Sequence, residues 1–101
     1  MSSLGKELQQ TIINLEKLRD AKHPPSDDIL ATLDKLYQQE IKLIAAAVNS
    51  NSVRYKIATK AMTEAAKKTK EAIADPANLE QAIGKVSNAI GMVTELLSEI
   101  V

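Results

Sequence analysis

Turn-forming residues are scarce in this chain, and their scarcity limits the fold more than any other feature. The sequence has only three glycines and three prolines among its 101 residues. Turn and cap residues gather instead in three short stretches, HPPSDD at 23–28, NSNS at 49–52 and ADPAN at 74–78. A β-sheet needs a tight turn between neighbouring strands, so this distribution argues against one.

The three stretches divide the chain into four segments with helical apolar spacing, and we predict helices over about residues 3–22, 26–48, 53–74 and 76–100. Prolines stop the first helix, Ser26 is the expected N-cap of the second, and Asp75 followed by Pro76 is a strong start signal for the fourth. Together these segments predict one all-α domain, residues 1–101, folded as an antiparallel four-helix bundle.

Each predicted helix has an inner face that follows from its apolar spacing. For the first helix these residues are Leu4, Leu8, Ile12, Leu15 and Leu18. For the second they are Ile29, Leu33, Leu36, Tyr37, Leu43, Ile44 and Ala47, widened by Leu30, Ile41 and Val48. For the third they are Ile57, Ala58, Ala61, Ala65, Thr69 and Ala72. For the fourth they form a heptad series, Leu79, Ile83, Val86, Ile90, Val93, Leu97 and Ile100.

A second arrangement is compatible with the same pattern. If the helical period continues through NSNS, the second and third segments become one helix of about fifty residues, at a cost of about 2 kcal/mol in helix propensity. The two short helices would then pack along the long one. A core so small would make the protein an obligate dimer.

The last segment carries a stripe of small residues beside its heptad series. The stripe, called the small-residue stripe below, has spacings of three and four and consists of Gly84, Ser87, Gly91, Thr94 and Ser98. A glycine inside a helix costs about 1 kcal/mol relative to alanine, so a close neighbour would explain why two occur here. We expect a helix-packing or dimer interface, either with a helix of the same chain or with a second copy. The alanines of the third segment make that segment the favoured intrachain neighbour.

The sequence offers little for catalysis or for metal or cofactor binding. There is no cysteine, and His23 is the only histidine, which excludes a di-iron bundle and zinc–sulfur sites. Asp27 and Asp28 fit the positive end of a helix better than an acid–base pair. The glycines do not form a phosphate-binding loop. We therefore expect no enzyme activity, cofactor, metal or small-molecule substrate.

Charge is balanced overall but uneven along the chain. Lysine and arginine total 13, as do aspartate and glutamate, so no global field attracts a polyanion. The third segment is basic, and its candidate anion-binding face consists of Lys56, Lys60, Lys67 and Lys70. Glu64 and Lys68 are spaced for an ion pair on the same helix. The chain lacks the aromatic residues that stack on bases, which makes nucleic acid an unlikely partner, and a membrane surface is equally weakly supported.

These features predict a small helical protein-interaction module that self-associates or binds another protein, as an adaptor, a chaperone-like protein or a neutralising partner. The alternative is binding of nucleic acid or anionic membranes through the basic face of the third helix. No stretch predicts a signal peptide or a membrane span, so we expect a cytoplasmic protein.

Overall fold

The protein is described by a computed structural model that covers residues 3–21, 27–46, 48–49 and 51–99. Within these ranges the chain forms no strand. It forms the α-helices α1 (Leu4–Ala21), α2 (Asp27–Ala45), α3 (Val53–Ala74) and α4 (Leu79–Ser98), and the 3-10 helix η1 (Pro76–Asn78). The prediction of four helices is confirmed. The single long helix is wrong, because α2 ends eight residues before α3 begins.

Side-chain caps mark the starts of α1, α3 and η1. The Ser3 hydroxyl accepts a hydrogen bond from the Lys6 amide at 3.2 Å, and the Ser52 hydroxyl accepts one from the Tyr55 amide at 3.1 Å. Asp75 caps η1 by accepting from the Ala77 amide at 3.1 Å, and α4 follows η1 directly. Such bonds satisfy amides that have no partner inside a helix. The predicted Ser26 cap lies outside the described residues.

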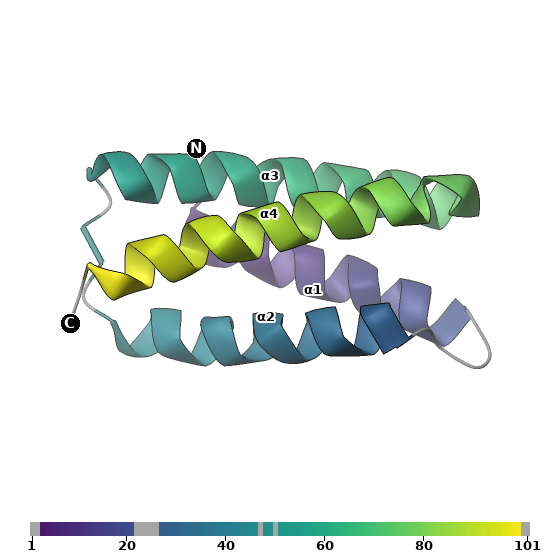
Figure 1. Ribbon diagram of the computed structural model, residues 1–101, viewed down its shortest axis with the longest axis horizontal. Helices are drawn as coiled ribbons and strands as arrows, with labels where there is room; N and C mark the ends of the chain where they lie inside the picture. Colours follow the sequence, from purple (N-terminus) through teal and green to yellow (C-terminus); the bar gives the residue numbers. More distant parts are fainter. Residues whose placement is uncertain (1–2, 22–26, 47, 50, 100–101) are drawn as a thin grey trace.

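The four helices pack against one another along the long axis of the molecule, which measures 39 × 22 × 17 Å (Figure 1). α1 packs against α2 and α3, and α4 also packs against α2 and α3. The Leu4 amide donates to the Tyr55 hydroxyl at 3.1 Å, which joins the first turns of α1 and α3. Although α2 and α3 follow each other in the sequence, they are not among the main packed pairs. Of these contacts, the one between α2 and α4 borders the candidate site.

Burial confirms the predicted inner face of α1 in full and that of α2 only in part. All five predicted α1 residues are buried, as are Ile29, Leu33 and Leu36 of α2. In contrast, Leu30 is 43% exposed, Ile41 68% and Ile44 81%, so their predicted place on the inner face is wrong. Near its end α2 buries Gln39 instead, because this side chain bonds to α4.

The core between α3 and α4 is built from small residues. Ala58, Ala65, Thr69 and Ala72 are fully buried as predicted, whereas Ile57 is 47% exposed and was wrongly placed inside. The buried stripe of α4 is Ala82, Val86, Ala89, Val93 and Leu96. The bulkier heptad residues Leu79, Ile83, Ile90 and Leu97 are only half-buried beside it. The alanines in this contact let α3 and α4 approach closely.

A buried polar cluster connects α1 to α3. The Asn14 amide nitrogen donates to the Ala66 carbonyl at 3.0 Å and to the Thr69 hydroxyl at 3.1 Å. Its oxygen accepts from the Gln10 amide at 3.0 Å. Both ends of the buried Asn14 side chain are therefore satisfied, which allows a polar residue inside an aliphatic core. This cluster aligns α1 with the middle of α3.

Candidate functional site

The small-residue stripe lies on the outer face of α4. Gly84, Ser87, Gly91, Thr94 and Ser98 are all exposed. A Cβ atom built on Gly84 or Gly91 would meet no heavy atom within 4 Å. The expected intrachain neighbour is therefore not there: α3 packs against α4 on the side of Ala82 and Ala89, where both helices are alanine-rich. The expectation of a second copy on this face stays a prediction.

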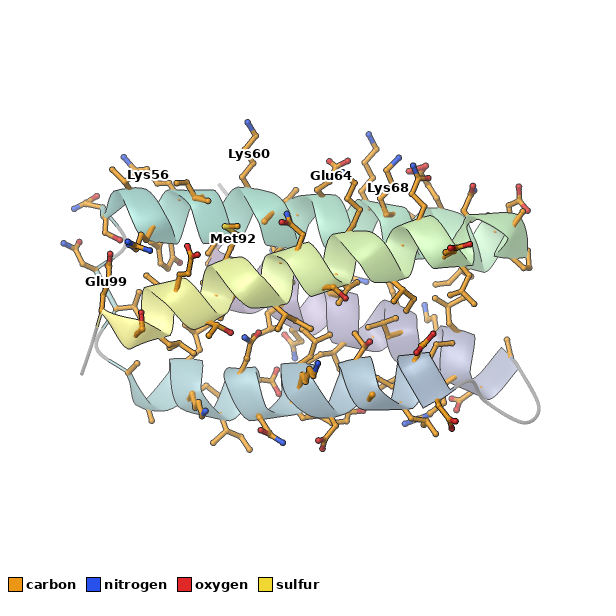
Figure 2. The ribbon with its side chains drawn as sticks, in the orientation of Figure 1. Lys56, Lys60, Glu64, Lys68, Met92 and Glu99 are labelled. Atoms are coloured by element: carbon orange, nitrogen blue, oxygen red, sulfur yellow. The ribbon has the colours of Figure 1, made fainter. Side chains whose placement is uncertain are left out.

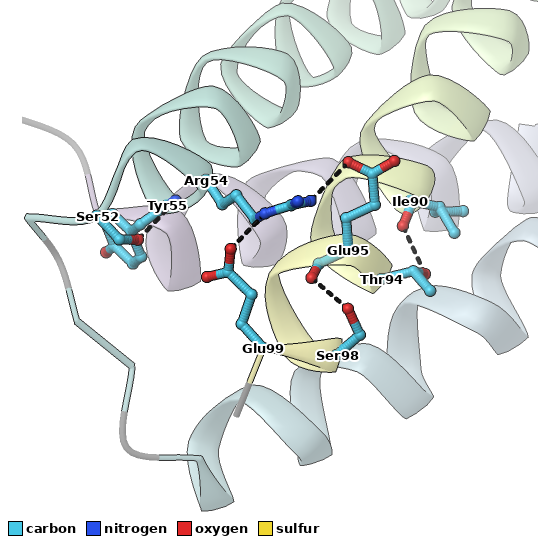
Figure 3. Close-up of polar contacts among 8 residues, drawn as sticks. All are labelled: Ser52, Arg54, Tyr55, Ile90, Thr94, Glu95, Ser98 and Glu99. Atoms are coloured by element: carbon cyan, nitrogen blue, oxygen red, sulfur yellow. Dashed lines mark hydrogen bonds and ion pairs between the residues drawn. The ribbon is translucent and has the colours of Figure 1, made fainter. Parts of the chain in front are cut away.

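Two hydroxyl groups of the stripe are bonded to their own helix (Figure 3). The Thr94 hydroxyl donates to the Ile90 carbonyl at 2.8 Å, and the Ser98 hydroxyl donates to the Glu95 carbonyl at 2.7 Å. These bonds fix both side chains close to the helix surface. As a result, no bulky side chain projects from the helix surface along the stripe.

A groove between α2 and α4 borders the stripe. From α4 it is lined by Ile90, Thr94, Leu97 and Ser98. From α2 it is lined by Lys35, Gln38, Gln39 and Lys42. Its described lining contains two lysines and no carboxylate. The groove lies between the stripe and the α2 lysines Lys35 and Lys42.

Gln39 lies at the floor of this groove and is only half satisfied. Its amide nitrogen donates to the Ile90 carbonyl at 2.9 Å and to the Thr94 hydroxyl at 3.0 Å. Its oxygen Oε1 is buried and accepts no hydrogen bond from the described residues, although the whole residue is just 7% exposed. A buried acceptor without a donor costs about 1–3 kcal/mol. Sequence reasoning missed Gln39; the signal was a polar residue three positions after Leu36 on the inner face of α2.

The end of α4 is tied to the start of α3 by charge. The Arg54 guanidinium pairs with Glu95 of α4 at 3.3 Å and with Glu99, the residue that follows α4 (Figure 3). All three side chains are partly exposed, so the pairs contribute little to stability. They mark where the end of α4 meets the start of α3, beside the stripe.

The candidate anion-binding lysines lie along the exposed side of α3. Lys56, Lys60, Lys67 and Lys70 are all exposed, and the labelled Lys56 and Lys60 extend away from α4 (Figure 2). Lys67 and Lys70 line a groove between α3 and α1, where Lys17 joins them. Lys17 was missed because nothing in the sequence places α1 beside α3.

Other predicted interactions have mixed outcomes. Lys68 pairs with Glu71 at 3.7 Å and forms no ion pair with Glu64. The exposed Asp27 and Asp28 occupy the first turn of α2, as predicted. In the described ranges, no group of three or more His, Asp or Glu residues is placed to hold a metal ion. His23 lies outside those ranges.

A hydrogen bond between α2 and α1 involves one of the two tyrosines. The Tyr37 hydroxyl donates to the Glu16 carboxylate at 2.6 Å. This bond raises the pKa of Tyr37 above its ordinary value, and partial burial adds to the effect. The pair belongs to the α1–α2 contact and lies outside the groove and the stripe.

No helix within the described part of the chain is both long and apolar enough to cross a membrane. Comparisons of the chain with protein-family models, with curated proteins and with solved structures found no match. The candidate site consists of the α4 stripe, the α2–α4 groove and Gln39.

Proposed function

We propose that this chain is a non-catalytic protein-interaction module, folded as an antiparallel four-helix bundle, that self-associates through the small-residue stripe of α4. The observation that carries the proposal is the pair of glycines in the middle of α4, both exposed and surrounded by open space. Each glycine costs the isolated helix about 1 kcal/mol relative to alanine. A partner helix that needs close approach offsets that cost.

The bordering groove supports the same proposal. Gln39 Oε1 is a buried acceptor beside the stripe that still lacks a described donor, and a partner can supply one. The proposed role is that of an adaptor, a chaperone-like protein or a neutralising partner in the cytoplasm. The absence of cysteine fits a reducing compartment.

Sedimentation velocity over a range of protein concentrations tests the proposal. The wild-type chain should sediment as a dimer or larger species, and the double variant Gly84→Leu, Gly91→Leu should sediment as a monomer. Gly5→Leu is the matched control, because Gly5 is also helical, exposed and surrounded by open space, but lies on α1. A wild-type chain that is monomeric at every concentration would contradict self-association.

A second candidate function is binding of nucleic acid or anionic membranes. It is favoured by the groove in which Lys67 and Lys70 meet Lys17. A polyanion column at low ionic strength should then retain the protein, with retention falling steeply as salt rises. Vesicles with anionic lipids test the membrane version. If neither binds, and Lys67→Glu with Lys70→Glu changes nothing, this candidate is excluded.

A further inference from the structure

We propose that α4 pairs with α4 of a second copy in an antiparallel register in which Gly91 of one copy faces Ser87 of the other. This inference rests on the proposed self-association. It adds which helices meet, in which direction they run and which residues oppose one another.

The spacing of the stripe sets the register. Gly84, Gly91 and Ser98 repeat every seven residues, and Ser87 and Thr94 repeat between them, as the two contact positions of a heptad do. In an antiparallel pair, each residue of one set faces a residue of the other set. Gly84 then faces Thr94 of the second copy, and Ser87 faces Gly91 of the second copy. Every central layer combines one glycine with one hydroxyl side chain, which permits close contact without a clash.

The two borders of the stripe fit this register as well. On the side of α2, α4 carries Ile83, Ile90 and Leu97, which the single chain leaves only half-buried. The second copy would cover this row with its own equivalent row, because residues on the same side of α4 meet in an antiparallel pair. Burial of such side chains is the main favourable contribution to association.

The border on the side of α3 decides between the two possible directions. It carries Gln81, Asn88 and Glu95, all exposed. In a parallel pair opposite borders meet, so Glu95 would face the apolar row of Ile83, Ile90 and Leu97 of the second copy, where its carboxylate would lose hydration. An antiparallel pair places Glu95 opposite Gln81 of the second copy, whose amide can donate to the carboxylate, and brings Lys85 of that copy near. Antiparallel helix dipoles add to the same preference.

Gln39 supplies the independent observation. Its donor groups are bound to Ile90 and Thr94, on either side of Gly91, and its oxygen has no described donor. The register places Ser87 of the second copy over Gly91, on the side of α4 that faces α2. Its hydroxyl is the donor of the second copy that this register brings toward Gln39. Because Oε1 is buried in the single chain and the amide nitrogen is already bonded to α4, this contact requires the Gln39 side chain to rearrange on association.

Disulfide cross-linking tests the register in the full chain, which has no native cysteine. The variants are Glu80→Cys and Ser98→Cys, near opposite ends of the stripe. In the proposed register, residue 80 of one copy faces residue 98 of the other. Two residues at position 98 would be about 27 Å apart at 1.5 Å rise per residue. Under mild oxidation each variant alone should stay uncross-linked, whereas their mixture should give a disulfide-linked dimer.

The outcomes separate the two proposals. If Ser98→Cys links to itself and the mixture gives no mixed product, the helices are parallel and the register is overturned. If the wild-type chain dimerises but neither sample links, α4 is not the contact and the register is again overturned. Only a monomeric wild-type chain would also overturn the proposed function.

A hydroxyl deletion tests the role of Gln39. Ser87→Ala should weaken dimerisation by roughly tenfold, the effect of losing one hydrogen bond to a buried acceptor. Thr63→Ala is the matched control, since it removes an exposed hydroxyl from α3 and should leave the dimer unchanged. Equal dimerisation of Ser87→Ala and wild-type protein would overturn the Ser87–Gln39 contact.

Discussion

At the scale of single residues, Gly84 and Gly91 lower the stability of the single chain and leave a part of the α4 surface without side chains. Both lie in regular helix, and nothing within 4 Å would meet an added Cβ. Their cost therefore comes from backbone entropy and solvent-exposed backbone. This cost can be measured separately from any association.

We expect Gly91→Ala to raise the free energy of unfolding of the single chain by about 0.5–1 kcal/mol, because alanine fits the existing backbone and restricts the unfolded chain. Urea denaturation at a protein concentration low enough to avoid association measures the change. Gly84→Ala should behave alike. A lower stability for both variants would mean that these positions are already packed, contrary to the open space around them.

The Tyr37–Glu16 hydrogen bond predicts a pH dependence. The pKa of Tyr37 is raised from its ordinary value of 10.0, so folding favours the neutral phenol. Its contribution is fully present below pH 10.0 and is lost as pH rises through the higher folded-state pKa. Urea midpoints should thus fall between pH 9 and 11 by less in Tyr37→Phe than in the wild-type chain. Identical falls in the two proteins would rule out the linkage.

At the scale of helices, apolar spacing identified elements better than it identified their buried sides. The buried side of α1 was predictable because this one side packs against both α2 and α3. Ile44 was misplaced because spacing does not show where a neighbouring helix stops covering α2. Of the α4 heptad residues, Val86 and Val93 are buried as predicted, whereas Leu79, Ile83, Ile90 and Leu97 lie at the edge of the contact, since spacing alone does not show which side of the stripe a neighbour covers. The adjacency of α1 and α3, which places Lys17 beside Lys67, depends on tertiary packing alone.

The alanine contact between α3 and α4 predicts a strong penalty for larger side chains. Ala65 is fully buried, so Ala65→Leu should lower the free energy of unfolding by about 1–3 kcal/mol by forcing the helices apart. Lys60→Leu, at an exposed position of the same helix, is the control and should change stability by less than about 0.5 kcal/mol. Thermal unfolding followed by circular dichroism compares the two. If Ala65→Leu is tolerated as well as Lys60→Leu, the helices do not approach as closely as proposed.

At the scale of the whole molecule, the packing arrangement leaves one face of α4 available for the proposed association. α4 fills the corner between α2 and α3 with its alanine and valine stripe, and this leaves its opposite face open. The Arg54 pairs hold its end against α3, and Gln39 holds it against α2. The exposed face is thus presented by a helix that is fixed on both sides, which reduces the entropy lost on association.

Self-association through that face predicts a melting temperature that depends on concentration. A partner that binds only the folded chain stabilises it by mass action, so the melting temperature of the wild-type protein should rise with protein concentration. Gly91→Leu should remove this dependence, because the new side chain would collide with Ser87 of the second copy. Gly5→Leu should retain it. Differential scanning calorimetry over a hundredfold range of concentration makes the comparison, and a wild-type melting temperature that stays constant over that range would show that folding and association are not linked.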